Sequence, residues 1–385
     1  MQITKFQTAI IEPVGGHGGM NYYDLGLARG LANNDCGVFL YTSTETNVEN
    51  GLSFRVIKNF KGIWGKTPKI LRAFRFFICL FITLQDIKCK SINLVHYHFF
   101  HYTAVELFCV KLAKVFRCKI VITAHDVESF FGHHSIKNAQ IIFASADAII
   151  AHNRISKNEL VDKLNLIDEK IYVIPHGNYL DFIENRPSRD KAREILGLSP
   201  EEKIILFFGQ IKEVKGLDIL IQSLPEVLKR YPSLKLLIAG KVWKDNLSTY
   251  EKIISNYSLR NNVIFHTHYI PDNEVSNYYC ASDLVVLPYR RIYQSGVLLM
   301  AISYKIPVLA SDIPGMTEII VDGQNGYTFK SEDVEDLSQK IIKIFSNSDD
   351  LPEIAEKGYK TVVKEHCWDT IGKLTSEVYK KVCYD

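Results

Sequence analysis

The sequence predicts an α/β protein with two doubly wound parallel-sheet domains that face each other across a cleft. Three observations lead to this fold. Short β-branched runs alternate with helical patterns along the chain, and strands that alternate with helices form parallel sheets covered on both faces. The length of 385 residues suits two ordinary domains. The polar, proline-containing segment 184–190 between two series of strands is typical of a linker.

The strands fall into two series, one in residues 1–185 and the other in residues 200–365. The first consists of Thr8–Glu12, Gly37–Tyr41, Leu94–His98, Lys119–Thr123, Ala148–His152 and Ile171–Ile174. The second consists of Lys203–Phe208, Lys235–Ala239, Asn262–His266, Leu284–Leu287 and Pro307–Ala310. We predict that the domains join within residues 182–200, and that the helical pattern of residues 366–385 crosses back onto the first domain. Functional residues should follow the strands, because ligands of such sheets bind at the carboxyl ends of the strands.

The composition narrows the class of protein. Apolar residues make up 47% and charged residues 23%, as in folded globular proteins. The net charge of +3 is too small to indicate a nucleic-acid partner. Eight cysteines without framework spacing favour a reducing cytoplasm. No histidine or cysteine spacing is typical of a zinc site. Residues 1–5 run directly into the first strand, so we expect no signal region.

The most apolar stretch, residues 76–84, is far shorter than the roughly 20 residues that span a bilayer. Its upstream flank is basic and aromatic, with Lys66, Lys69, Arg72 and Arg75 near Trp64 and Phe74. Such a helix either rests on an anionic membrane surface or packs on the core with a basic, solvent-facing side. The sequence favours the second interpretation.

Two loops of the second series have the chemistry of an anion site. After the strand that ends at Phe208, Gly209 permits close approach of the backbone to a ligand, and Lys212 and Lys215 would face a ligand that carries phosphates. After the strand that ends at Leu287, Gln294, Ser295 and Gly296 begin a helix whose amide groups can donate to a diphosphate. In each loop the alternative is an ordinary turn with solvated side chains. Glu318, after a third strand, either reaches the same site or begins the next helix.

The first series offers a second group of candidates. Gly15, Gly16 and His17 follow the first strand, where exposed amide groups can bind anions or sugar hydroxyls, unless the loop serves only to turn the chain. His98 ends one strand, and His125 and Asp126 follow the next. A histidine beside acids at a strand end can bind the hydroxyl groups of a substrate. The alternative is a histidine satisfied by nearby backbone, which is the more common case for His98.

With these segments in place, the chain resembles glycosyltransferase family 4, the retaining enzymes of the GT-B fold, along nearly its whole length. In the second half the matching segments are Phe208–Ile211 with Lys215 and Gly216, Leu237–Gly240, Ala281–Tyr289, Pro307–Ser311, Pro314–Glu318 and Asp322–Tyr327. In the first half they are Gly15 with Gly16, His125 with Asp126, and Ile174–Asn178. The resemblance implies two Rossmann-like domains, the second of which holds a nucleotide-sugar donor while the first binds the acceptor.

The resemblance also implies roles for individual residues. Lys215 would contact phosphate and His125 the transferred sugar. The donor would lie against Gly209, Gln210, Gly240, Ile270, Gln294, Ser295, Gly296, Val297, Leu298 and Glu318, and the acceptor or its sugar against Gly15, Gly16, His17, His98 and Asp126. The chain departs from the family in two places. Gln210 replaces the usual arginine, with Lys212 as a candidate substitute, and Ile292 and Met300 replace the usual pair of glutamates.

These features predict a retaining, metal-independent transfer of a hexose from a UDP- or GDP-sugar to a carbohydrate or lipid-linked acceptor, in surface polysaccharide or glycan assembly. The enzyme would be cytoplasmic, either free or peripheral at the inner face of the plasma membrane. Because the two glutamates are missing, a non-catalytic partner of an active transferase remains the alternative. A GT-B epimerase is a third interpretation, less favoured because no second pair of acids is evident. The sequence does not specify the sugar, the base or the acceptor.

Overall fold

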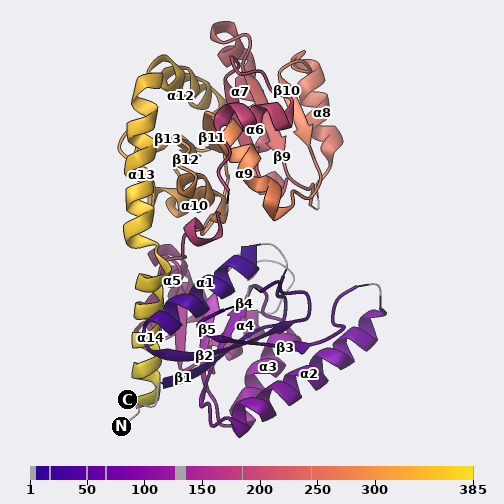
Figure 1. Cartoon of the computed structure of the whole chain (residues 1–385), viewed down its shortest axis with the longest axis vertical. Coiled ribbons are helices and arrows are strands. Elements are labelled where there is room, and N and C mark those ends of the chain that lie inside the picture. Colours follow the sequence, from indigo (N-terminus) through magenta and orange to yellow (C-terminus); the bar gives the residue numbers. More distant parts are fainter. Residues whose placement is uncertain are drawn as a thin grey trace. The chain divides into compact units, whose positions relative to one another are not determined.

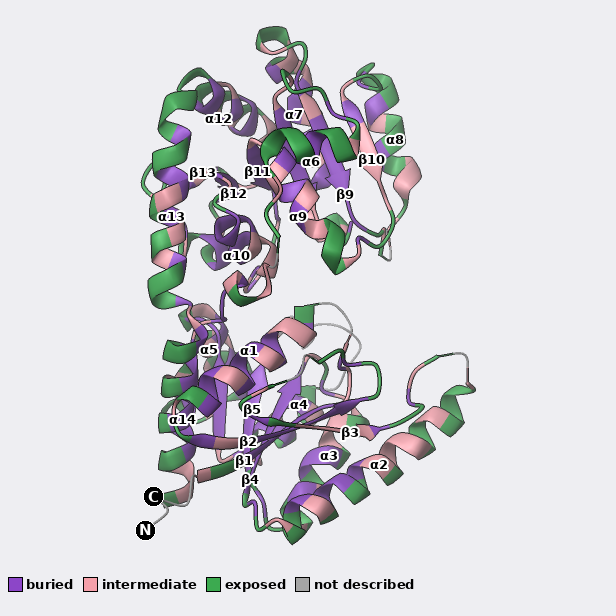
Figure 2. Cartoon of the chain, viewed as in Figure 1, coloured by how far each residue is buried: buried purple, intermediate pink, exposed green. Residues whose placement is uncertain are grey.

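The computed structural model describes residues 6–16, 19–48, 51–65, 67–125, 136–183, 185–243 and 245–384. The chain divides into two compact units (Figure 1). The first unit consists of Met1–Gly177 and Glu365–Asp385, and the second of Asn178–Lys364. Each unit has its own parallel sheet, whose strands are mostly buried (Figure 2).

The sheet of the first unit has seven strands in the order β3-β2-β1-β4-β5-β6-β7, and every pair is parallel. The strands are β1 (Phe6–Glu12), β2 (Cys36–Ser43), β3 (Arg55–Phe60), β4 (Leu94–Phe99), β5 (Lys119–Ala124), β6 (Ala148–Ala151) and β7 (Ile171–Val173). The chain builds outward from β1 in one direction and from β4 in the other. Ligands of doubly wound sheets bind at such a switch point, which here lies at the ends of β1 and β4.

Helices follow most strands of the first unit, and a further helix of this unit comes after the second unit in the sequence. They are α1 (Gly19–Asn33), α2 (Lys69–Cys89), α3 (Ala104–Val115), α4 (Ile136–Ala144), α5 (Arg154–Leu164) and the C-terminal α14 (Trp368–Tyr384). α14 packs on α1 through glycines that bring the two backbones together. A Cβ atom on Gly372 would lie 2.1 Å from the carbonyl carbon of Gly30, and one on Gly30 would lie 2.0 Å from the carbonyl oxygen of Trp368. No other residue fits at either position without a shift of a helix.

The second unit has a six-stranded parallel sheet in the order β10-β9-β8-β11-β12-β13, with its switch point between β8 and β11. The strands are β8 (Ile204–Phe208), β9 (Lys235–Ala239), β10 (Val263–His266), β11 (Leu284–Leu287), β12 (Val308–Ser311) and β13 (Tyr327–Phe329). The helices are α6 (Arg189–Leu196), α7 (Leu217–Arg230), α8 (Leu247–Asn256), α9 (Asp272–Ala281), α10 (Gly296–Ser303), α11 (Pro314–Thr317), α12 (Val334–Ser346) and α13 (Leu351–Glu365). Its core is apolar and includes Phe207, Leu220, Leu236 and Val286.

The predicted fold of two doubly wound α/β domains is confirmed, and each predicted strand is present. Two strands were not predicted, β3 and β13, and both lie at an edge of their sheets. β3 is mostly half-buried and β13 has only three residues, so neither carries the apolar run of a central strand.

The contacts divide the chain at Gly177 and assign the segment 182–200, where we predicted the join, to the second unit. Residues Arg189–Leu196 form α6, which packs against α9. Arg193 on this helix is fully buried and donates to the carboxylate of Asp283 at 2.8 Å. The composition of residues 184–190 is typical of a linker, but the helix that follows is fixed to the second unit by the buried side chain of Arg193.

Candidate functional site

Three segments of the second unit meet at its switch point. Gly209 follows β8 with a φ of +100°, a conformation that favours glycine. A Cβ atom at Gly209 would lie 3.1 Å from Nζ of Lys215 and 3.2 Å from Cγ2 of Val297. Lys215 Nζ also lies 5.0 Å from the ring centroid of Tyr289, in the loop after β11. The ammonium group is therefore held beside the end of β8 and the start of α10.

Glycines keep the neighbouring loops in backbone contact. Gly216, at φ +64°, would place a Cβ atom 1.9 Å from the carbonyl oxygen of Pro288. Gly240, which follows β9 at φ +139°, would place one 2.0 Å from the carbonyl oxygen of Gly209. The loops after β8, β9 and β11 consequently form one surface of main chain around Lys215.

The first turn of α10 adds amide groups to this surface. Ser295 is the N-cap, and its Oγ accepts from the amide of Leu298 at 3.2 Å. The amides of a first helical turn have no partner within the helix, and the helix dipole makes this end partially positive. Gly296 allows the close approach of Tyr179, whose hydroxyl lies 2.5 Å from the place of a Cβ atom. A lysine and a helix N-terminus together form a site for an anion.

The other predicted donor residues lie around these loops. Gln210 is exposed, and Lys212 precedes a single 3₁₀ turn in which its carbonyl accepts from the amide of Lys215 at 2.9 Å. Gln294 is half-buried before the N-cap, whereas Ile270 is buried just before α9. Glu318 is exposed and directly follows α11, so the interpretation that it begins a helix is wrong.

Sequence reasoning gave no role to Arg290 and Asp218, although they fix the loop after β11. The guanidinium of Arg290 donates to both carboxylate oxygens of Asp218, at 2.9 and 2.7 Å, and to Glu332 at 3.0 Å. These carboxylates raise the pKa of Arg290 above its ordinary value. Since 72 residues separate Arg290 from Asp218, no local pattern indicates the pair.

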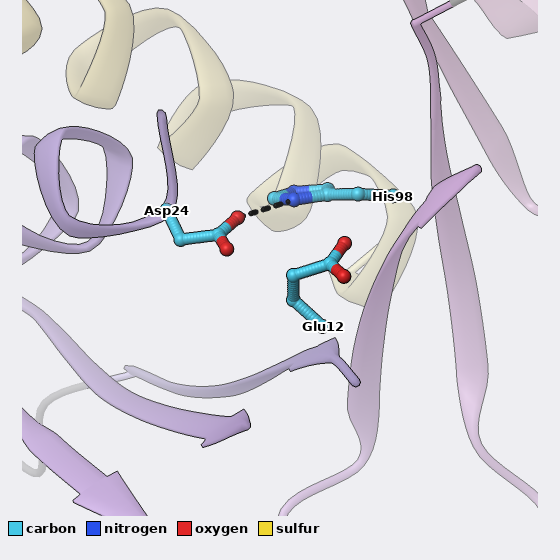
Figure 3. A group of neighbouring side chains, drawn as sticks. All are labelled: Glu12, Asp24 and His98. Carbon is cyan, nitrogen blue, oxygen red and sulfur yellow. Dashed lines mark hydrogen bonds and ion pairs between the residues drawn. The ribbon is translucent and has the colours of Figure 1, made fainter. Parts of the chain in front are cut away.

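In the first unit, three ionisable side chains meet at the switch point between β1 and β4 (Figure 3). Glu12 ends β1, His98 lies on β4 and Asp24 lies on α1, and all three are buried. A hydrogen bond of 2.8 Å joins His98 Nδ1 to Asp24 Oδ1, and the amide of Val14 donates to Glu12 Oε1 at 2.8 Å.

Burial favours the neutral form of each member of this cluster. It raises the pKa of Glu12 to about 8, raises the pKa of Asp24 well above its ordinary value, and lowers the pKa of His98 to about 4. Among the described residues this group has ligand atoms close enough to share a metal ion. A divalent ion would require both buried carboxyl groups to lose their protons, so the contacts support a neutral, hydrogen-bonded cluster instead.

His125 is held by aromatic rings and by a second histidine. Its ring stacks on Phe100, with centroids 4.8 Å apart, and meets the edge of Tyr23 at 4.6 Å. His152 Nδ1 lies 3.0 Å from the carbonyl oxygen of Ile174, and His152 Nε2 lies 3.3 Å from His125 Nδ1. Burial lowers the pKa of both histidines, so both are neutral at pH 7.

This chain of hydrogen bonds sets the tautomer of His125. A carbonyl oxygen only accepts, so His152 carries its proton on Nδ1 and accepts through Nε2. His125 therefore donates through Nδ1, and its Nε2 presents a lone pair. That Nε2 is buried and has no hydrogen-bond partner among the described residues. It can accept a hydrogen bond from a ligand hydroxyl.

The remaining candidates in the first unit differ in their surroundings. Gly15 and Gly16 have positive φ angles and pack against the end of β2 and the residues that follow it, where a Cβ atom on Gly15 would lie 2.1 Å from Thr46 Oγ1. His98 is satisfied on one side by Asp24, whereas its Nε2 has no partner among the described side chains. His17 and Asp126 lie outside the described residues.

Two doubly wound parallel-sheet units in one chain agree with the GT-B class of protein. Residues 188–361 match the family described as Glycosyl transferases group 1, and residues 17–181 match Glycosyltransferase Family 4. The two matches account for both units, and the chain belongs to this glycosyltransferase family.

Individual relatives agree with this assignment. The chain is 28% identical over 237 residues to an uncharacterized glycosyltransferase of Methanocaldococcus jannaschii, and this match covers 60% of this chain and 59% of the relative. It is 30% identical over 219 residues to a D-inositol 3-phosphate glycosyltransferase of Nocardia farcinica, and this match covers 54% of this chain and 47% of the relative. The matched part thus spans about half the length of these relatives. The crystal structure of Anabaena HepE in complex with UDP-glucose has the same fold, with a TM-score of 0.76 and 19% identity over 97% of this chain and 99% of HepE.

Proposed function

We propose that this protein is a retaining glycosyltransferase that moves a hexose from a UDP- or GDP-sugar to a carbohydrate or lipid-linked acceptor, without a bound metal. The observation that carries the proposal is the convergence of Gly209, Lys215 and Val297 at the switch point of the second unit. This is where an anionic cofactor or substrate binds in doubly wound sheets. The relatives named glycosyltransferases and the complex of HepE with UDP-glucose support the same chemistry.

In the proposed reaction the protein positions the substrates and stabilises charge. Lys215 and the amides of α10 bind the diphosphate and stabilise the charge that grows on it as its bond to the anomeric carbon breaks. The acceptor oxygen bonds to that carbon on the same face, and its proton passes to the departing diphosphate oxygen. Ile292 and Met300 have no carboxylate, so neither can form a covalent glycosyl intermediate. His125 Nε2 accepts a hydrogen bond from a hydroxyl of the transferred sugar.

A thermal-shift screen with nucleotides tests the donor site. UDP, GDP and their sugars should be compared with AMP and with glucose alone. A ligand at a hundred times its dissociation constant adds about 2.7 kcal/mol to the free energy of unfolding, so UDP or GDP should raise Tm by several degrees. The shift should disappear in Lys215→Ala and persist in Lys229→Ala, which removes an exposed lysine of α7. A shift of equal size in both variants would show that the nucleotide binds elsewhere.

The absence of the two usual glutamates at Ile292 and Met300 supports a second candidate function. In it, the protein is a subunit that binds the donor but does not turn it over. Both candidates predict the thermal shift. Product analysis separates them, because only the enzyme releases the sugar from the donor when a broad panel of acceptors is added. Stabilisation by the donor without sugar release would favour the non-catalytic subunit.

We further propose that the exposed side of α2 rests on an anionic membrane surface. No helix among the described residues is long and apolar enough to cross a membrane. On α2, however, Ile70, Phe74 and Phe81 are exposed by 87%, 62% and 45%, and the basic residues Lys69 and Arg75 lie in the first two turns of the same helix. Apolar side chains interspersed with cations are the pattern of an interfacial helix, and Figure 2 shows how little of this helix is buried.

Vesicle co-sedimentation tests this surface. The protein should bind vesicles that contain phosphatidylglycerol and should bind pure phosphatidylcholine more than tenfold less, because each cation near an anionic surface contributes about 1 kcal/mol. Binding should weaken at high salt. Phe74→Glu combined with Phe81→Glu should abolish it, whereas Ile195→Glu, at an exposed apolar position of α6, should have no effect. Equal binding by the two variants would rule out α2 as the contact.

A further inference from the structure

A cavity of about 290 Å³ lies at the switch point of the first unit. The ends of β1 and β4, the helices α2 and α3, and the segment around Trp64 line it. Most of its lining is apolar and includes the aromatic side chains of Trp64, Phe76 and Phe100. A dry apolar cavity of about 150 Å³ in another protein holds benzene. This one therefore has room for a short alkyl chain or for one or two small rings.

Three residues that line this cavity have buried polar atoms that lack hydrogen-bond partners among the described residues. These atoms are Oε2 of Glu12, Nε of Arg72 and Nε2 of His98. A buried polar group without a partner costs about 1–3 kcal/mol, so a ligand that supplies partners is favoured. Between them, these residues can donate to and accept from hydroxyl groups. The cavity thus combines an apolar wall with a polar end at Glu12 and His98, whose ligand atoms lie within 4.8 Å of each other.

The polar end lies toward the proposed sugar site. The ring centroids of His98 and His125 are 5.3 Å apart, and both rings meet the edge of Tyr23. The apolar wall includes Phe76 and Leu80 of α2, which are spaced four residues apart and so share one side of the helix. On the other side of α2 lie the exposed Phe74, Ile78 and Phe81. One helix therefore supplies both the cavity wall and the apolar outer surface.

We infer that this cavity binds the alkyl or prenyl chain of a lipid-linked acceptor, with the sugar of that acceptor against Glu12 and His98. The inference rests on the proposed transferase function and decides which class of acceptor the enzyme takes. An amphiphile matches a cavity that is apolar along its wall and polar at one end, whereas a free sugar leaves the aromatic wall uncovered. Each methylene group moved from water into the cavity strengthens binding about fourfold, equivalent to about 0.8 kcal/mol.

A chain-length series tests the inference on the full-length protein. The probes are methyl, butyl, hexyl and octyl β-D-glucopyranosides below their micelle concentrations, with dissociation constants from calorimetry. We expect about fourfold tighter binding per methylene until the cavity is full.

Ala73→Phe should fill the cavity and remove this dependence, since Ala73 is an exposed residue of α2 that also lines it. Ala104→Phe, at an exposed position of α3 outside the lining, is the matched control. Affinity that does not depend on chain length, or the same dependence in both variants, would overturn the inference.

A fluorescence measurement locates the chain directly. Bromine quenches nearby tryptophans, so 8-bromooctyl glucoside should quench Trp64. The quenching should vanish in Trp64→Phe, which retains Trp243 and Trp368. Quenching that persists in Trp64→Phe would place the alkyl chain elsewhere.

Stabilisation by UDP or GDP is measured separately, so failure of the glycoside series with a normal nucleotide shift refutes the acceptor class and leaves the transferase proposal intact. A normal glycoside series without stabilisation by UDP or GDP refutes the donor site and leaves the acceptor class intact.

Discussion

Replacement of Lys215 by alanine should lower kcat by two to three orders of magnitude, the typical effect of losing one group that stabilises charge in a transition state. The ammonium group lies beside Gly209 and Val297, at the end of β8 and the start of α10. It should therefore stabilise the departing diphosphate more than the intact donor. The measurement is initial-rate kinetics with the donor identified by thermal shift.

Two variants make this result interpretable. Lys229→Ala should retain the wild-type rate because Lys229 is exposed and pairs with Glu226 on α7. Lys215→Arg should recover part of the rate, since it restores the charge but not the shape of the ammonium group. An unchanged kcat in Lys215→Ala, with Tm also unchanged, would remove this lysine from the mechanism.

The stability of the first unit should be greatest near pH 6.5 and fall on both sides. Burial lowers the pKa of His98 and His152 to about 4 and that of His176 to about 3. Below pH 6.5 the unfolded chain binds protons that the folded unit excludes, so stability falls as the pH falls. Each of these three histidines should contribute a loss of about 2 kcal/mol by pH 5.

The carboxyl groups act in the opposite direction. Glu12 has a pKa of about 8 in the folded unit, and the pKa of Asp24 is also raised. Above their ordinary pKa values both groups lose protons in the unfolded chain while they keep them in the folded unit, so stability falls as the pH rises. The fall due to Glu12 continues up to about pH 8. At acidic pH this partly offsets the histidines, but burial also lowers the pKa values of His96, His125 and His366, which adds to the loss.

Urea unfolding from pH 4.5 to 8.5 measures this profile. In Trp243→Phe the remaining tryptophans, Trp64 and Trp368, both belong to the first unit and report on it alone. His152→Gln should reduce the slope on the acidic side by about 1.4 kcal/mol per pH unit, the effect of one proton. A flat profile, or an unchanged slope in His152→Gln, would contradict the assignment of these histidines as buried and neutral.

The proposed donor site was largely predictable from sequence, because its residues lie close together along the chain. A strand, a glycine and a lysine follow one another within residues 203–216, and the N-cap Ser295 directly precedes its helix. For the proposed acceptor site in the first unit, the sequence indicated only some of the residues. His98 and His125 were candidates from their place after strands, whereas Glu12, Asp24 and His152 had no signal of their own. The hydrogen bonds that reveal these roles join residues far apart in the sequence. His98 and Asp24 are 74 positions apart, and His152 and His125 are 27 positions apart.

The sequence by itself determined the class of fold and the family, because the alternation of strands and helices and the order of short motifs are properties of the chain read locally. Only the tertiary structure decided that the units divide at Gly177, that Arg193 is a buried anchor, and that Glu12, Asp24 and His98 share one buried cluster. It also decided the tautomer of His125 and the presence of the cavity behind α2. The physical reason is that burial, and with it the protonation state and the unsatisfied hydrogen bonds of a side chain, depends on which distant segments pack around it.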